Sequence, residues 1–446
     1  MDKLVIQGGS RLRGSIHVGG SKNTALPLMA AALLADGETV IRNMPVLQDV
    51  DTFSNVLRVT GSKVTWDPDE DPTTPDSMHI DASRLAHFEA PYELVKKMRA
   101  SFYMLGALLA RGGYAKVSLP GGCAWGPRPV DLHLKGIEAL GASIEMDRGY
   151  VIARAPRGGL KGGRFRFEPS SVGATINVML AAVTASGQSV LENAAAEPDV
   201  VVFGEMLKAM GAQIEGLGTP TITIDGVDSL NPVDFDNCPD RIELGTYMIA
   251  AAMAGEPGET FTITGAQPDH LGDAFMQAFE ATGAGIDYVR TAECGPAHIT
   301  ITTPERVRAV SITTAPYPGF PTDLQAQWSV MMSQAADNSE VVDTVYTDRF
   351  KHIPELRRMG ANCFVIGNKV VVEGGSKLEG THVMSTDLRA SVSLVLAGMV
   401  AEGETHVQRV YHLDRGYERL EGKLAGAGIN IHREQYDEFA GSGDDD

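Results

Sequence analysis

The sequence predicts an α/β protein of two similar domains, each made of three copies of one supersecondary unit. The first observation is an amphipathic segment that ends in a glycine and a small residue, or a near variant, with an apolar residue close behind. It occurs six times, as VLRVTGSKV, GIEALGASI, MLKAMGAQI, AFEATGAGI, LRRMGANCF and KLAGAGINI. The second observation is a segment rich in Ala, Leu and Met that also recurs six times. Regular recurrence of this kind indicates a repeat architecture.

Each amphipathic segment predicts a helix that ends at its glycine and leads into a strand. These glycines are Gly61, Gly141, Gly211, Gly283, Gly360 and Gly426, which lie 66 to 80 residues apart. Glycine is favoured just past a helix end because it adopts the left-handed conformation without steric cost. We therefore expect six glycine C-caps.

Each Ala-, Leu- and Met-rich segment predicts a helix buried on all sides, because it is apolar nearly all round. These helices are expected to begin near Lys22, Lys96, Ser171, Arg241, Asp323 and Asp387. Most are followed by a strand-like stretch, as in ETVIRNM, AKVSLPG, QSVLENA, ETFTITG and ETHVQRV. The repeated unit is thus a buried helix, a strand, a loop, an amphipathic helix and one or two further strands.

The six units divide into three plus three. We expect one domain over residues 22–239 and a second over 1–21 and 240–446, with the first residues supplying strands that the last units need. The acidic end, residues 438–446, is expected to be disordered.

Composition excludes several classes of protein. A formal charge of −19 argues against a general nucleic-acid binder, which needs a basic face. The four cysteines are too far apart for a zinc site or a disulfide framework, which suits a reducing cytoplasm. The start of the chain lacks the pattern of a signal peptide, and the apolar runs are too short to span a bilayer. We expect a cytoplasmic protein.

The stretch SLPGGCAWGPRPVDLH, residues 118–133, predicts a long loop that carries a thiol. Its prolines block a helix or an interior strand, and its glycines permit unusual backbone angles. Arg128 lies five residues after Cys123, and a nearby guanidinium favours the thiolate. A surface loop with an incidental cysteine remains open from composition alone.

Polar residues at the starts of the apolar helices indicate an anion site. Helix N-termini offer free N–H groups and a partial positive charge, so cations such as Lys22 and Arg99 are unexpected there unless an anion binds. Helix caps are the alternative, and Ser171, Asp323 and Asp387 are suitable caps. Arg349 and Arg415 each follow an aspartate in a turn, where an arginine can be held rigidly. Exposed surface pairs remain open for both.

Taken together, these motifs resemble the enolpyruvyl transferase family. The resemblance runs from about Met1 to Ile431, through motifs in family order: GGSKNTALP, APYELVKKMRAS, SLPGGCAWGPRPVDLH, SVGAT, PDRIE, TAPYPGFPTDLQAQ, STDLRAS and YHLDRGYERL. It implies two inside-out α/β domains, each of three units with buried helices surrounded by strands and outer helices, and an active site in the cleft between them. It also implies transfer of the enolpyruvyl group of phosphoenolpyruvate to the 3-hydroxyl of UDP-N-acetylglucosamine, for peptidoglycan synthesis. No metal and no cofactor are expected.

The resemblance also implies site residues. Lys22, Asn23, Arg128, Arg389 and Arg415 are expected to bind phosphoenolpyruvate. The expected UDP-N-acetylglucosamine contacts are Asn23, Arg99, Arg128, Pro129, Val130, Asp131, Leu132, Ser171, Val172, Gly173, Asp323 and Val345. The expected catalytic residues are Lys22, Cys123, Asp323, Asp387 and Arg415. Among them, Cys123 matches a proton donor or enolpyruvyl carrier, Asp323 the carboxylate beside the 3-hydroxyl, and Asp387 with Arg389 a charged pair.

The sequence departs from the family at Trp125, Pro169, Leu244 and DTVYTDRF (343–350), which puts affinity and loop closure in doubt more than reaction type. Two alternatives remain. The shikimate-pathway enolpyruvyl transferase is disfavoured by the cysteine loop. A catalytically silent sugar-nucleotide sensor is disfavoured by the intact Lys22, Cys123, Asp323 and Arg415.

Overall fold

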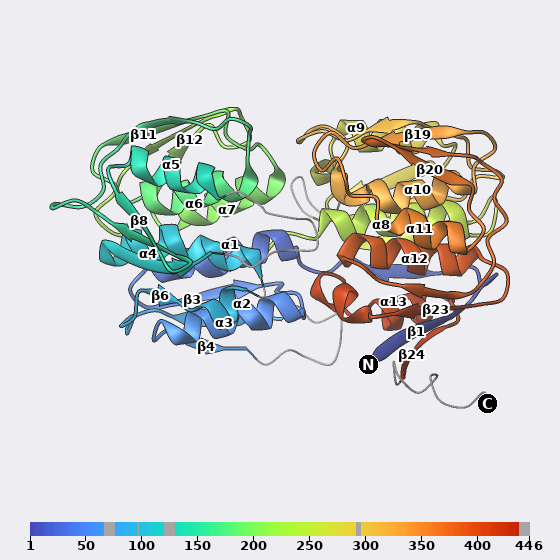
Figure 1. Cartoon of the computed structure of the whole chain (residues 1–446), viewed down its shortest axis with the longest axis horizontal. Helices are drawn as coiled ribbons and strands as arrows, with labels where there is room; N and C mark the ends of the chain where they lie inside the picture. Colours follow the sequence, from blue (N-terminus) through green and yellow to red (C-terminus); the bar gives the residue numbers. More distant parts are fainter. Residues whose placement is uncertain (67–75, 97, 120–129, 291–295, 437–446) are drawn as a thin grey trace. The chain divides into compact units, whose positions relative to one another are not determined.

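The structure, a computed structural model, describes residues 1–66, 76–96, 98–119, 130–290 and 296–436. It forms two compact units. The continuous unit is Gly20–Cys238, and the discontinuous unit is Met1–Gly19 with Pro239–Asp446. Each unit has a hydrophobic core of its own. The sequence colours of Figure 1 show the discontinuous composition, because the blue first strand lies among the orange and red elements.

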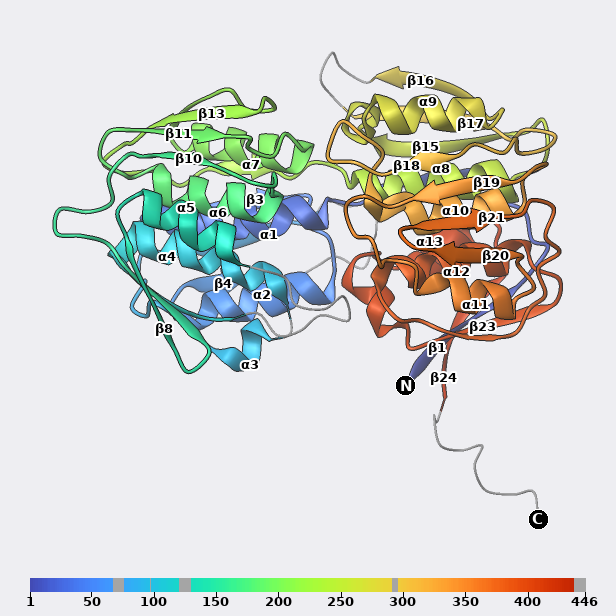
Figure 2. The same ribbon diagram turned by 45° about the horizontal axis from the view of Figure 1, so that its top comes forward.

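Buried helices form the core of each unit, as the Ala-rich segments predict. They are α1 (Lys22–Ala31), α4 (Met104–Gly112) and α6 (Val172–Ala182) in the continuous unit, and α8 (Arg241–Ala254), α10 (Gln325–Ser333) and α12 (Leu388–Val400) in the discontinuous unit. Every residue from Ile242 to Ala254 of α8 is buried. Figure 2 shows α8, α10 and α12 close together, with strands outside them, and the three helices pack on one another. The inside-out α/β architecture is therefore confirmed.

The strands form six sheets of the same design. Those of the continuous unit are β14 (Asp234–Asp236)-β3 (Glu38–Arg42)-β5 (Met78–Asp81)-β4 (Lys63–Thr65), β6 (Glu89–Ala90)-β7 (Tyr114–Ser118)-β9 (Tyr150–Arg154)-β8 (Ser143–Asp147) and β10 (Arg164–Arg166)-β11 (Gln188–Glu192)-β13 (Thr221–Asp225)-β12 (Gln213–Glu215). Those of the discontinuous unit are β2 (Ser15–His17)-β15 (Thr260–Ala266)-β17 (Ala297–Thr302)-β16 (Gly285–Arg290), β18 (Ile312–Thr313)-β19 (Ser339–Val342)-β21 (Lys369–Val372)-β20 (Cys363–Ile366) and β22 (His382–Met384)-β23 (Glu404–Gln408)-β1 (Asp2–Gln7)-β24 (Ile431–Gln435). In each sheet the first pair is parallel and the other pairs are antiparallel.

The first residues of the chain complete two sheets near its other end. Strand β1 lies between β23 and β24, and β2 pairs with β15. The expectation that residues 1–21 supply strands to later units is therefore confirmed.

The amphipathic helices are α2 (Gln48–Val59), α5 (Asp131–Ala139), α7 (Pro198–Ala209), α9 (Asp273–Ala281), α11 (His352–Arg358) and α13 (Leu420–Gly426). Five of the six expected cap glycines have a positive φ: Gly61, Gly141, Gly211, Gly283 and Gly360. The sixth expectation is wrong. Gly426 is the last residue of α13, and the positive φ falls at Gly428, because the helix continues two residues further than the motif suggests.

The expected helix start near Lys96 is also wrong. Tyr92–Val95 forms a separate short helix, α3, and the 3₁₀ turn η2 (Arg99–Tyr103) leads into α4. Arg99 therefore begins its turn and does not lie one turn inside a helix.

Candidate functional site

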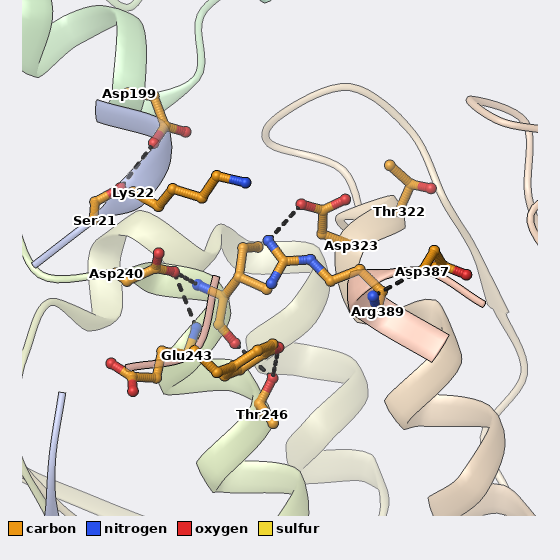
Figure 3. Close-up of polar contacts among 12 residues, drawn as sticks. Ser21, Lys22, Asp199, Asp240, Glu243, Thr246, Thr322, Asp323, Asp387 and Arg389 are labelled. Carbon is orange, nitrogen blue, oxygen red and sulfur yellow. Dashed lines mark hydrogen bonds and ion pairs between the residues drawn. The ribbon is translucent and has the colours of Figure 1, made fainter. Parts of the chain in front are cut away.

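A group of charged side chains surrounds Asp323 at the start of a buried helix of the discontinuous unit. Asp323 lies in the 3₁₀ turn η4 (Thr322–Leu324) that precedes α10. Its Oδ1 accepts a hydrogen bond from Arg349 Nη1 at 2.5 Å, and its Oδ2 accepts one from Arg389 Nη2 at 2.8 Å. Figure 3 shows Arg389 reaching from α12 toward Asp323. One carboxylate thus holds two guanidinium groups from different segments of the chain.

This geometry corrects two interpretations of the sequence. Asp323 is not the cap of α10, since Leu324 occupies that position and no side chain makes a cap bond there. Arg349 is not part of an exposed surface pair, because it is only 8% exposed. Asp387 caps α12 by accepting from the Arg389 and Ala390 N–H groups, while the Arg389 guanidinium binds Asp323.

The two arginines determine the electrostatics of this group. Burial alone would raise the pKa of the Asp323 carboxyl, but the charges and hydrogen bonds of Arg389 and Arg349 hold it well below its ordinary value. Burial alone would lower the pKa of the Arg389 guanidinium, but the neighbouring Asp323 carboxylate raises it. The carboxylate is therefore ionised and has a low proton affinity.

A fully buried aspartate that sequence reasoning missed, Asp343, supports this turn. It accepts hydrogen bonds from the hydroxyls of Thr314 and Thr322, at 2.7 Å each, and from the N–H groups of Val345 and Tyr346. The Thr322 hydroxyl also accepts from Arg349 Nη1 at 3.2 Å. Asp343 thereby connects the turn of Asp323 with the partly exposed Val345, an expected ligand contact. Asp343 is the first residue of the DTVYTDRF segment, whose polar composition gave no signal of burial.

Arg415 lies in the 3₁₀ turn η5 (Val410–Arg415), which packs on α12. Two residues later, the buried Tyr417 hydroxyl is 2.8 Å from Thr246 Oγ1, with Gln327 Nε2 at 3.2 Å. The Tyr417 ring lies 5.5 Å from the Arg389 guanidinium. Arg415 and Arg389 therefore belong to neighbouring elements of one unit.

In the continuous unit, Lys22 is the first residue of α1, and Asn23 follows it. Lys22 Nζ lies 2.6 Å from Asp49 Oδ2. A lysine is unexpected at a helix start, and here it forms an ion pair with a carboxylate of the same unit. Asp199 accepts hydrogen bonds from Ser21 and Thr24 in the same turn, and Figure 3 shows the Ser21 contact. Acidic residues at α2 and α7 thus surround the start of α1, where the helix dipole favours them.

The expected sugar-nucleotide residues of α5 and α6 come together. Val130, Asp131 and Leu132 occupy the start of α5, and Ser171, Val172 and Gly173 the start of α6, where Ser171 accepts the Ala174 N–H. A Cβ on Gly173 would lie only 3.3 Å from the His133 ring, so glycine allows these two helix starts to approach.

A buried asparagine that sequence reasoning missed holds this region together. Asn177 Oδ1 accepts the Gly106 N–H at 2.7 Å, and its Nδ2 lies 3.0 Å from both Phe102 O and His133 Nδ1. Phe102 belongs to η2, the turn that begins at Arg99. An asparagine in the middle of an apolar helix was the available signal, since buried amides are hydrogen-bonded.

Cys123, Trp125, Arg128 and Pro129 lie outside the described residues. Within the described ranges, no group of three or more His, Cys, Asp or Glu residues could hold a metal ion. No helix in that part of the chain has the length and apolar character needed to cross a bilayer.

Comparison with known proteins decides the family. The model of the family EPSP synthase (3-phosphoshikimate 1-carboxyvinyltransferase) matches residues 6–424. The chain belongs to this enolpyruvyl transferase family. The resemblance found in the sequence is therefore confirmed.

Curated relatives and solved structures agree with this assignment. The chain is 51% identical over 441 residues to the UDP-N-acetylglucosamine 1-carboxyvinyltransferase of Chloroherpeton thalassium, covering 99% of both proteins. It is 49% identical to the protein of the same name from Chlorobaculum parvum, covering 99% of this chain and all of the relative. The enolpyruvyl transferase NikO from Streptomyces tendae has a TM-score of 0.85 at 25% identity, over 97% of this chain and 99% of NikO. An EPSP synthase from Acinetobacter baumannii shares the fold, with a TM-score of 0.75 at 17% identity over 98% of this chain and all of that one.

Proposed function

We propose that this enolpyruvyl transferase is a UDP-N-acetylglucosamine 1-carboxyvinyltransferase (EC 2.5.1.7). It transfers the enolpyruvyl group of phosphoenolpyruvate to the 3-hydroxyl of UDP-N-acetylglucosamine and releases phosphate. The observation that carries the proposal is identity of about half the residues, over nearly the whole chain, to relatives of that name. The reaction would begin peptidoglycan precursor synthesis in the cytoplasm and thereby serve cell shape and division.

Phosphoenolpyruvate carries a phosphate and a carboxylate, so its site needs several cations, preferably arginines. We assign this role to Lys22, Arg128, Arg389 and Arg415, with Asn23 beside Lys22. The ion pairs of Lys22 with Asp49 and of Arg389 with Asp323 support the assignment, because each leaves a preorganised cation at a helix start.

For UDP-N-acetylglucosamine, we assign binding to the helix starts of the continuous unit and to side chains of the discontinuous unit. The residues are Asn23, Arg99, Arg128, Pro129, Val130, Asp131, Leu132, Ser171, Val172, Gly173, Asp323 and Val345. The N-termini of α5 and α6 supply N–H groups suited to a diphosphate.

The chemistry is an addition followed by an elimination. In the addition, the 3-hydroxyl oxygen bonds to C2 of phosphoenolpyruvate while C3 gains a proton, for which Cys123 is the assigned donor. In the elimination, C3 loses a proton, the C2–O bond to phosphate breaks and the double bond returns. Lys22 and Arg415 balance the charge of the departing phosphate, and Asp387 holds the start of α12, which carries Arg389.

Asp323 is assigned as the acceptor that orients the 3-hydroxyl. Its two arginine partners lower its proton affinity, which favours hydrogen bonding over full proton removal in the ground state. As the hydroxyl oxygen bonds to C2, its acidity rises, and the carboxylate then lies in place to receive the proton.

The test is phosphate release from phosphoenolpyruvate by the purified protein with each acceptor. We expect release with UDP-N-acetylglucosamine and formation of its enolpyruvyl ether by mass spectrometry. Release with shikimate 3-phosphate instead would assign the protein to the shikimate pathway. If neither acceptor releases phosphate, although the sugar nucleotide binds, the protein is a sensor and the proposed function is wrong.

A further inference from the structure

Asp343 is a buried aspartate to which the proposed function assigns no role. It follows strand β19 directly, and its side chain is fully buried. Burying a carboxylate costs free energy unless hydrogen bonds satisfy its oxygens. Four donors do so here, but an apolar side chain would avoid the cost altogether. The donors themselves therefore indicate what this carboxylate holds in place.

The two carboxylate oxygens of Asp343 serve different segments of the discontinuous unit. Oδ1 accepts the N–H groups of Val345 and Tyr346, at 2.9 and 2.8 Å, and thereby shapes the loop after β19. Oδ2 accepts the Thr322 hydroxyl at 2.7 Å, in the turn that also carries Asp323. One side chain thus connects an assigned contact of the sugar nucleotide with the residue assigned to its 3-hydroxyl.

Strand pairing fixes the position of Asp343 itself. Strands β18 and β19 are parallel, with Thr313 opposite Val342, so Thr314 and Asp343 follow them at the same edge of the sheet. The Thr314 hydroxyl donates to Asp343 Oδ1 at 2.7 Å and accepts the Thr344 N–H at 3.1 Å. The carboxylate is therefore held by the sheet, and it can in turn hold the two segments that donate to it.

The Thr322 hydroxyl transmits this constraint to Asp323. It donates to Asp343 Oδ2 and accepts from Arg349 Nη1 at 3.2 Å, which uses its one donor and one of its acceptor sites. The same Arg349 Nη1 donates to Asp323 Oδ1 at 2.5 Å. Figure 3 shows Thr322 beside Asp323 at the start of α10. A continuous set of hydrogen bonds thus leads from the sheet to the Asp323 carboxylate.

We propose that Asp343 and Thr322 are positioning residues for the transfer reaction. Through Thr322, Asp343 Oδ2 fixes the orientation of the Asp323 carboxylate, and through its own contacts Oδ1 fixes the loop of Val345. The inference rests on the proposed function, in which Asp323 orients the 3-hydroxyl and Val345 contacts the same ligand. One buried carboxylate thereby keeps the group that acts on the hydroxyl in register with a residue that binds the sugar nucleotide.

The first test removes the Thr322 hydroxyl and keeps the volume of the side chain. In Thr322→Val, kcat should fall about tenfold or more, because the Asp323 carboxylate is no longer held in one orientation. KM for UDP-N-acetylglucosamine should stay within about twofold of wild type, because the Val345 loop keeps its contacts with Oδ1. Thr322→Ser retains the hydroxyl and should restore kcat to within about threefold. The matched control, Thr282→Val, removes a buried hydroxyl of the same unit that donates to Phe279 O, and it should change neither constant.

The second test replaces the carboxylate. The amide of Asp343→Asn has a single acceptor oxygen, which cannot serve both segments. Besides a kcat lowered about tenfold or more, KM for UDP-N-acetylglucosamine should therefore rise about fivefold, the scale of one lost hydrogen bond. In the double variant Thr322→Val/Asp343→Asn, kcat should lie within about twofold of Asp343→Asn, because both changes act on Asp323 through the same bond. Each kcat is referred to the folded fraction, measured by circular dichroism.

A wild-type kcat in Thr322→Val would overturn the inference, and so would equal losses in Thr322→Val and Thr322→Ser. If Asp343→Asn does not fold, these two Thr322 variants alone decide. A wild-type protein that releases no phosphate with UDP-N-acetylglucosamine contradicts the proposed function instead. Crystal structures of the wild type and Thr322→Val then test the positioning role, which is wrong if Asp323 keeps both arginine contacts in the variant.

Discussion

The contacts of Asp323 determine the charge and the orientation of its carboxylate. Its side chain is 26% exposed, yet it binds two guanidinium groups at 2.5 and 2.8 Å. An aspartate that only capped a helix would contribute about 1 kcal/mol to stability and nothing to turnover. An aspartate between two arginines instead presents a fixed, ionised acceptor.

Asp323→Asn should slow turnover by about a hundredfold or more, because a neutral amide accepts hydrogen bonds more weakly and cannot take a proton. We expect the fold to persist, with the unfolding free energy lowered by about 1–3 kcal/mol because Arg349 and Arg389 lose their counterion. Steady-state kinetics and denaturant unfolding measure the two effects. The exposed Asp236 gives a control, Asp236→Asn, that should change neither quantity. Near-normal turnover in Asp323→Asn would remove this residue from the mechanism.

Cys123 should react with electrophiles faster than the other cysteines, because Arg128 favours its thiolate. Burial raises the pKa of Cys363 to about 11, so that thiol should react slowly. A small anionic epoxide such as fosfomycin should label Cys123, and mass spectrometry of the digested protein locates the adduct. Labelling of Cys238, Cys294 or Cys363 instead would contradict this prediction.

The activity of Cys123 variants should follow their acidity. Cys123→Asp should keep substantial activity and resist the epoxide, with a pH optimum shifted downward, because a carboxylic acid can donate the proton. Cys123→Ser should be far weaker, because a hydroxyl is a poor donor near neutral pH. A serine variant with wild-type turnover would mean that the thiol has no chemical role.

His352, buried in α11, should make stability depend on pH. Burial, with the nearby charge of Arg349, lowers its pKa from 6.5 to about 3. Below pH 6.5 the unfolded chain binds a proton at this histidine that the folded protein does not. As the pH is lowered, the unfolding free energy therefore decreases by about 1.4 kcal/mol per pH unit, until about pH 3. His352→Gln should remove about 2 kcal/mol of the loss between pH 7 and pH 5, as measured by denaturant unfolding. The exposed His298 supplies the control, since His298→Gln should retain the wild-type slope. An equal slope in both variants would exclude His352 as the cause.

At the scale of elements, the end of α13 shows how a short motif can misplace a cap. GAGI offers two glycines, and the sequence favours the first, but the left-handed residue is Gly428, with φ of 93°. Gly426 completes the helix, and a Cβ there would meet nothing within 4 Å.

Gly428→Ala should lower the unfolding free energy by about 1 kcal/mol or more, because alanine is strained at a positive φ. Gly426→Ala should instead leave it unchanged or raise it by up to about 1 kcal/mol, because alanine is the better helix former. Denaturant unfolding of the two variants measures this opposite effect. The reverse order would place the cap at Gly426.

At the scale of the whole molecule, the first strand of the chain pairs with two of the last strands, in the discontinuous unit. Strand β1 lies between β23 and β24, and its Leu4 and Ile6 are fully buried. The last sheet therefore depends on residues more than 400 positions away in the sequence, as the pair of Leu4 with Val407 shows.

Deletion of residues 1–8 should abolish cooperative unfolding of the discontinuous unit, because it removes an interior strand, which leaves β24 without a partner strand and one edge of β23 unpaired. Leu4→Ala is the milder version and should cost about 2–5 kcal/mol. The exposed Gln7 of the same strand gives the control, Gln7→Ala, expected to change stability by less than about 0.5 kcal/mol. Calorimetric melting measures all three proteins. A deleted chain that melts like wild type would show that β1 is dispensable.

The sequence by itself determined the α/β class, the repeated unit, the buried helices and the family. These features depend on local periodicity and on motifs read in order, which need no knowledge of distant contacts. Only the tertiary structure decided that Asp323 binds Arg349 and Arg389, that Asp49 accompanies Lys22, and that Asn177 connects η2 with α6. Each of these contacts joins residues at least 26 positions apart, and their partners are charged or polar types that occur throughout the chain. Composition and spacing do not select one partner among many, because the selection is made by the packing of helices and strands that brings particular side chains within hydrogen-bond distance.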